Sequence, residues 1–270
     1  MLTTIEATAK YILKKSKSKA QVGIILGTGL GGLVDEIKID MELPYDSIPN
    51  FPVSTVEGHK GKLIFGTLGN KEVVAMQGRF HYYEGYGMDE VTFPVRVMKK
   101  MGIESLFVSN ASGGLNPTFK VGDIMIINDH INMFGTNPLI GKNHDSLGPR
   151  FPDMSEPYSK KLIAKAFDIA NNKGITVQQG SYVGTSGPTF ETPAEYKMFR
   201  ILGGDAVGMS TVPEIIVARH MNMTCFGISI ITDSGVPGEI VEISHEEVQE
   251  VAAKAQPFMA LIMKELIASL

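Results

Sequence analysis

Two segments of the chain combine residues that can hold an anion. In the stretch 76–85, Arg79 and His81 stand two positions apart, so their side chains project from the same side of an extended backbone. A guanidinium group grips a phosphate through its fork of N–H donors, and an imidazole can add to that grip. The run 27–29 is Gly-Thr-Gly after an apolar segment, where glycines let backbone N–H groups approach an anion and Thr28 supplies a hydroxyl. A surface loop and a tight turn are the alternatives, and the density of polar groups in 76–85 favours an oxyanion site.

Two further segments place small or polar residues directly after apolar runs. The stretch 108–117 passes from an apolar run into Asn110, Ala111 and glycines, and such a strand end is where open α/β sheets bind ligands. The stretch 207–214 passes through Ser210 into an expected helix, whose N-terminus could bind phosphate. Ordinary turns and simple helix capping are the alternative interpretations.

Phe190 and Glu191 bring an aromatic ring and an acid together. Phe190 can stack on a planar ring, and Glu191 can accept hydrogen bonds from ring N–H groups. Glu191 could instead mark the start of a helix, where the helix dipole favours a carboxylate. The isolated histidines His59 and His245 have no metal-ligand spacing around them, and taken alone each fits a structural role.

Apolar runs alternate with helical patterns along most of the chain. We expect helices at 3–18, 89–101, 158–174, 192–202 and 212–222, and a last helix after Ser244. We expect strands at 21–26, 62–66, 72–76, 104–109, 122–128, 177–185, 205–208 and 224–231. The stretch 132–157 is rich in Gly, Pro, Asn and Asp and predicts a long loop that is functional or covers an interface. The alternation predicts an α/β fold with a largely parallel sheet, in a single domain over residues 1–270.

The composition bounds the class of protein. The chain has 270 residues, 43% of them hydrophobic, and a formal net charge of -4, which argues against nucleic acid or an anionic membrane as a partner. No apolar run approaches the roughly 20 residues of a membrane-spanning helix. The single cysteine, Cys225, lies in an apolar run, so we expect an inert core thiol in a cytoplasmic protein. No spaced set of cysteines and histidines resembles a zinc site, and we expect no metal.

In their order along the chain, these segments resemble the trimeric purine nucleoside phosphorylases, a family that includes the methylthioadenosine phosphorylases. The matching segments are 27–31, 58–61, 76–85, 110–117, 121–125, 187–192 and 205–219. The resemblance covers most of the chain and implies a mixed central β-sheet, partly barrel-like and flanked by helices, in a homotrimer. It also implies phosphorolysis of a purine nucleoside to free base and ribose 1-phosphate, with inorganic phosphate as co-substrate and no metal or organic cofactor.

The resemblance assigns a role to each candidate residue. The phosphate-binding residues would be Thr28 (serine in many relatives), His59, Arg79, His81, Asn110, Ala111 and Ser210. The nucleoside-binding residues would be Tyr83, Met209 and His245 at the ribose, and Phe190, Glu191 and Asp233 at the purine. The catalytic residues would be His81, Glu191 and Asp233. Phe151, in the long loop, would reach into the site of a neighbouring subunit.

Position 233 departs from the family pattern. It is asparagine in typical enzymes for 6-oxopurines, whereas this chain has Asp233, as the methylthioadenosine phosphorylases do at the similar position. An amide can donate a hydrogen bond to purine N7, but an ionised carboxylate can only accept, so Asp233 would have to be protonated or deliver a proton. Glu191 points to guanine and hypoxanthine. We therefore expect inosine and guanosine as the main substrates, and the response to adenosine is left open.

Three other functions fit parts of the same pattern. A methylthioadenosine phosphorylase would need an apolar contact where His245 offers a polar partner to a ribose 5′-hydroxyl. A hydrolytic nucleosidase would not need Arg79 and His81 around a phosphate. A non-catalytic purine sensor could keep Phe190 and Glu191 but has no use for the anion-binding set.

Overall fold

The computed structural model of the chain describes residues 1–27, 30–53, 55 and 60–270. Two of the residues predicted to bind phosphate, Thr28 and His59, lie outside the described residues. The other predicted site residues can all be placed.

The described strands form a mixed sheet that closes on itself in part. The strands are β1 (Val22–Leu26), β2 (Lys38–Pro44), β3 (Lys62–Leu68), β4 (Lys71–Gln77), β5 (Ser105–Gly114), β6 (Ile124–Met133), β7 (Val177–Thr185), β8 (Ala206–Gly208) and β9 (Thr224–Ser234). Their order in the sheet is β2-β3-β4-β1-β5-β8-β7-β6-β9, and β5 also pairs with β9. That last pairing closes β5, β8, β7, β6 and β9 into a five-stranded barrel, from which β1 to β4 extend. The expected mixed, partly barrel-like sheet is confirmed.

The strand directions correct the expectation of a largely parallel sheet. The pairs β1–β4, β1–β5, β5–β9, β6–β7 and β7–β8 are parallel, but β2–β3, β3–β4, β5–β8 and β6–β9 are antiparallel. Alternation of helices and strands does not reveal these pairs, because hairpins and short crossing strands interrupt it. The predicted hairpin is present, with β3 and β4 joined around Gly69, which has a φ of 64°.

Strand β2 was not predicted from the sequence, because it lies at the edge of the sheet. It pairs only with β3 among the described strands, and most of its residues are exposed. Its charged residues Lys38, Asp40 and Glu42 break any apolar run. Charged side chains of this kind are common on edge strands, where they discourage pairing with other molecules.

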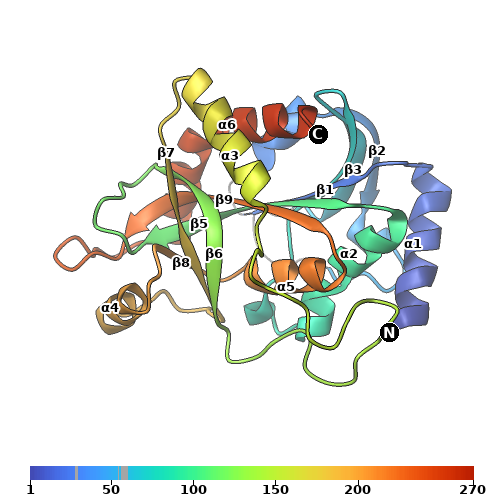
Figure 1. Cartoon of the computed structure of the whole chain (residues 1–270), viewed down its shortest axis with the longest axis horizontal. Helices are drawn as coiled ribbons and strands as arrows, with labels where there is room; N and C mark the ends of the chain where they lie inside the picture. The colour runs from blue at the N-terminus through green and yellow to red at the C-terminus, as the bar shows by residue number, and fades with distance from the viewer. Residues whose placement is uncertain (28–29, 54, 56–59) are drawn as a thin grey trace.

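Helices cover both sides of the sheet. They are α1 (Leu2–Ser16), α2 (Met88–Met101), α3 (Lys160–Asn172), α4 (Pro193–Ile201), α5 (Val212–His220) and α6 (His245–Ala268). In Figure 1, α3 and α6 lie on one side of the strands and α2 and α5 on the other. The predicted helices are all present, and Ser244 caps the last one by accepting a hydrogen bond from the backbone N–H of Glu247 at 3.2 Å.

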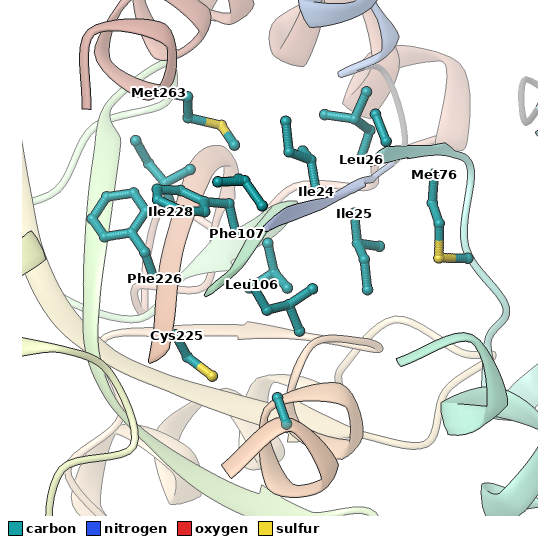
Figure 2. Packing of buried hydrophobic residues seen from close by; sticks show 14 of the residues in the cluster. Ile24, Ile25, Leu26, Met76, Leu106, Phe107, Cys225, Phe226, Ile228 and Met263 are labelled. Atoms are coloured by element: carbon teal, nitrogen blue, oxygen red, sulfur yellow. The ribbon is translucent and has the colours of Figure 1, made fainter. Parts of the chain in front are cut away.

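The core holds the central parallel strands in place. Every residue of β1 is buried, as expected for a strand covered on both faces. Figure 2 shows Ile24 and Leu106 of neighbouring strands, with Phe107 beside Phe226 and Met263 of α6 above them. The Phe107 and Phe226 rings are 5.6 Å apart. Because β1, β5 and β9 are parallel neighbours, their carboxyl ends meet at one edge of the sheet.

Candidate active site

A cavity of about 660 Å³ opens at the carboxyl ends of β1, β5 and β9. It is lined by eleven of the predicted site residues: Arg79, His81, Tyr83, Asn110, Ala111, Phe190, Glu191, Met209, Ser210, Asp233 and His245. Of the predicted residues that the structure describes, Phe151 alone lies elsewhere. The cavity therefore brings together side chains from segments that are far apart in the sequence.

Arg79 is held rigidly at one end of this cavity. It is 1% exposed, and its Nε donates to Glu214 Oε1 at 3.0 Å. Its Nη1 donates to the carbonyl oxygen of Ser109 at 2.7 Å and to Ser210 Oγ at 3.2 Å. Glu214, in the first turn of α5, was not predicted as a site residue. The sequence indicates Glu214 only indirectly, because a buried guanidinium needs a carboxylate partner somewhere in the chain.

The end of β1 approaches this arginine closely because residue 27 is glycine. A Cβ on Gly27 would lie 2.8 Å from the carbonyl oxygen of Ser109 and 3.3 Å from Arg79 Nη1. The first distance is too short for a real contact, so a side chain here would push β1 away from β5. The glycine was singled out in the sequence for its freedom near an anion, and in the structure it also keeps the strand ends close.

A strained turn places Ser210 beside Arg79. Thr211 has φ 71° and ψ -53°, and the N–H of Val212 donates to the carbonyl oxygen of Ser210 at 2.7 Å, which is the pattern of a γ-turn. Such turns are rare and store strain, which persists where the surroundings fix them. Here Asn110 Nδ2 donates to Thr211 Oγ1 at 2.8 Å. The turn leads directly into α5, so Ser210, which lines the cavity, lies just before the N-terminus of a helix, where anions are favoured.

His81 is fixed from both sides. Its Nδ1 lies 3.1 Å from Glu84 Oε1, and its ring stacks on Tyr83 with 4.7 Å between centroids. Burial would raise the pKa of Glu84, but hydrogen bonds from His81 and Thr55 outweigh it and lower this pKa to about 2. An ionised Glu84 can only accept, so Nδ1 carries the proton. Burial lowers the pKa of His81, although the hydrogen bond with Glu84 acts in the opposite direction.

The other end of the cavity carries two acids with raised pKa values. Burial raises the pKa of Glu191 to about 7, and Thr185 Oγ1 donates to its Oε1 at 3.3 Å. Burial also raises the pKa of Asp233, against the hydrogen bonds it accepts from Thr232 Oγ1 at 2.9 Å and from the Tyr196 hydroxyl at 3.3 Å. Glu191 can therefore exist in either protonation state near neutral pH, and Asp233 keeps its proton to a higher pH than an exposed aspartate does. Perturbed acids in a cavity of this kind are typical of a functional site.

Several lining residues were not assigned an individual role from the sequence, although most of them lie in the candidate segments. They are Gly27, Ser112, Gly113, Val207, Gly208, Thr232 and Val248. Each is a close sequence neighbour of a predicted residue, and proximity was the signal that could have found them. Gly113 has a further reason to be glycine, since a Cβ there would lie 2.8 Å from Asp233 Oδ2.

Phe151 lies on a different surface. It is 87% exposed in the loop between β6 and α3, with the Arg150 guanidinium 5.8 Å from its ring centroid. It faces a hollow lined also by Leu139 and Ile140, away from this chain's own cavity. A role in catalysis thus requires a second copy of the chain.

Other features of the described residues bear on function class. None of the described helices has the length and apolar character to cross a membrane. Within the described residues, no group of three or more His, Cys, Asp or Glu side chains could hold a metal ion. Cys225 is buried, and burial raises the pKa of its thiol to about 12, as expected of an inert core cysteine.

Comparison with known proteins points to one family. Residues 21–268 match the Phosphorylase superfamily. Purine nucleoside phosphorylase 1 of Geobacillus stearothermophilus is 54% identical over 265 residues, covering 98% of this chain and 97% of the relative. A solved structure of Schistosoma mansoni purine nucleoside phosphorylase with adenosine has a TM-score of 0.94 and 43% identity, covering 98% and 96% of the two chains. One with inosine has a TM-score of 0.94 and 42% identity, covering 99% and 96%.

The Tyr196 hydroxyl offers a direct test of the electrostatics at Asp233. In Tyr196→Phe, a donor that stabilises the ionised carboxylate is lost, so we expect the pKa of Asp233 to rise further. The measurement is a pH titration of the Asp233 carboxyl carbon by NMR. Tyr11→Phe is the matched control, because the Tyr11 hydroxyl donates to the Ser47 carbonyl at the surface. An unchanged Asp233 titration in Tyr196→Phe would contradict the assignment.

Proposed function

The chain belongs to the phosphorylase superfamily and is a purine nucleoside phosphorylase, and on this premise we propose that its main substrates are inosine and guanosine, including their deoxy forms. Inorganic phosphate is the second substrate, and the products are the free base and (deoxy)ribose 1-phosphate. The observation that supports this proposal most is that one cavity is lined both by Arg79, which can bind phosphate, and by Phe190 and Glu191, which can bind a purine.

At the phosphate end, the protein positions the nucleophile. Arg79, Ser210 and the backbone around Ala111 hold a phosphate dianion below the anomeric carbon, and His81 donates from Nε2 when it is protonated. The bond from the sugar to the purine breaks, and its electron pair leaves with the base. Phosphate stabilises the cationic sugar and then bonds to its anomeric carbon with inversion. Positioning and fixed donors supply most of the rate enhancement.

At the base end, Glu191 and Asp233 have different roles. Ionised Glu191 accepts hydrogen bonds from ring N–H groups, while Phe190 lies against the ring. Protonated Asp233 donates to purine N7 and stabilises the negative charge that develops there. The raised pKa of Asp233, caused by burial, supports this role, because a proton is then present at higher pH than for an exposed aspartate.

The ribose contacts distinguish this proposal from its nearest alternative. Tyr83, Met209 and His245 also line the cavity, and in this proposal they contact the ribose. His245, at the first position of α6, offers a polar partner to a 5′-hydroxyl, which a methylthio group would not use. This favours nucleosides over methylthioadenosine.

We also propose a homotrimer in which Phe151 completes the site of a neighbour. Support comes from exposure: Phe151 is 87% and Ile140 74% exposed on the same loop, and exposed apolar groups of this kind suit an interface. We further propose that residues 1–270 form one catalytic domain and that the protein is cytoplasmic.

Release of free base tests the proposed reaction. With inosine or guanosine we expect hypoxanthine or guanine only when phosphate is present, and a lower kcat/KM for adenosine than for inosine. Base release without phosphate would indicate a hydrolase, and nucleoside binding without release a sensor. If adenosine equals or exceeds inosine in kcat/KM, the base preference is wrong, and Asp233→Asn then shows whether residue 233 is the cause.

Subunit mixing tests the role of Phe151. Phe151→Ala should raise the KM for inosine about tenfold, the size of one lost aromatic contact, while Phe258→Ala, an exposed phenylalanine on α6, should not. Co-expression of Phe151→Ala with Arg79→Met subunits should restore a low KM in mixed trimers, because intact Phe151 then reaches intact sites. No restoration in mixed trimers would contradict the shared site.

A further inference from the structure

A second, smaller cavity lies between α2, the C-terminal end of α5 and the loop at 134–159. Its volume is about 300 Å³, and it shares no lining residue with the nucleoside cavity. Arg96, His220 and Lys142 bring basic side chains to it from three different segments, and Asp89 is the acidic residue among its described lining residues. The function described above makes no use of this cavity.

Arg96 is buried there without a counter-charge in contact. It is 4% exposed, and its Nε and Nη1 have no hydrogen-bond partner among the described residues. Within the described part of the chain, no carboxylate oxygen lies within 4.0 Å of its guanidinium, although Asp89 acts on it from farther away. A buried charge with unused donors is costly, and in native proteins an ion or water satisfies it.

His220 brings a second buried basic side chain to the same cavity. It is 3% exposed, and the backbone of Gly148 and Pro149 lies close enough to act on its ring. Burial lowers its pKa, and the nearby Arg96 lowers it further, whereas the backbone of Pro149 and Gly148 acts in the opposite direction. The exposed Lys142 adds an ammonium group to the lining of the cavity.

We infer that this cavity is a second anion site, which holds a small inorganic anion against Arg96 with help from His220 and Lys142. The bound anion supplies the negative charge that the buried guanidinium lacks. It also joins α2, α5 and the loop that carries Phe151, so its effect is on stability rather than on the chemistry of the nucleoside cavity.

Bromide is a suitable probe, because its anomalous scattering locates it in a crystal. In solution, sodium bromide replaces sodium gluconate at constant ionic strength, and the unfolding temperature is followed. For the wild-type enzyme we expect a bromide peak within contact distance of Arg96 and an unfolding temperature that rises with bromide concentration. Arg96→Met should lose both, whereas Lys161→Met, at an exposed lysine of α3, should keep both.

A second, milder variant keeps the test valid if Arg96→Met does not fold. Lys142→Ala changes an exposed side chain, and it should shift the bromide midpoint several-fold to higher concentration without altering inosine phosphorolysis. Absence of a bromide peak from this cavity in wild-type crystals would overturn the inference. An equal bromide response in wild-type and Arg96→Met would overturn it as well, and neither result would bear on phosphorolysis at the first cavity.

Discussion

The buried ion pair between Arg79 and Glu214 is the interaction on which the rest of the site depends. Its nitrogen and oxygen are 3.0 Å apart, and the two side chains are 1% and 4% exposed. Removing two charges from water costs several kcal/mol each, so such a pair persists only with good geometry and further hydrogen bonds. The Ser109 carbonyl and the Ser210 hydroxyl supply these to Arg79. The pair thereby ties the chain after β4 to β5 and to the first turn of α5.

The two ends of the cavity have opposite electrostatic character, and burial produces the difference. At one end, a guanidinium and a helix N-terminus favour negative charge. At the other end, burial raises the pKa values of Glu191 and Asp233, so negative charge is disfavoured until a ligand compensates for it. Tyr196 and Thr232 hold Asp233 in place while they limit how far its pKa rises. The proposed arrangement, with a nucleoside above a phosphate, matches this difference in charge, because in it the sugar becomes cationic between the phosphate and the two acids.

The sequence predicted the helices and most of the strands, because apolar periodicity is a local pattern. Arg79 and His81 were candidates on their chemistry and spacing, whereas Tyr83, Asp233 and His245 were assigned to the site only through the family resemblance. Strand β2 and the antiparallel pairs could not be predicted, since edge exposure and barrel closure leave no periodic signal. Glu214 and Tyr196 act through contacts with residues 135 and 37 positions away, which no local pattern encodes. The role proposed for Phe151 depends on a second chain, and the sequence indicates it only through the family resemblance.

The central claim is that a guanidinium fixed in one orientation, rather than positive charge alone, holds the oxyanion. Phosphate affinity of Arg79→Lys, measured by calorimetry, tests it most directly, because lysine keeps the charge but loses the fork and its bonds to Glu214, Ser109 and Ser210. We predict a phosphate Kd raised about ten- to hundredfold, equivalent to one or two charge-assisted hydrogen bonds. A Kd within twofold of the wild-type value would contradict the account.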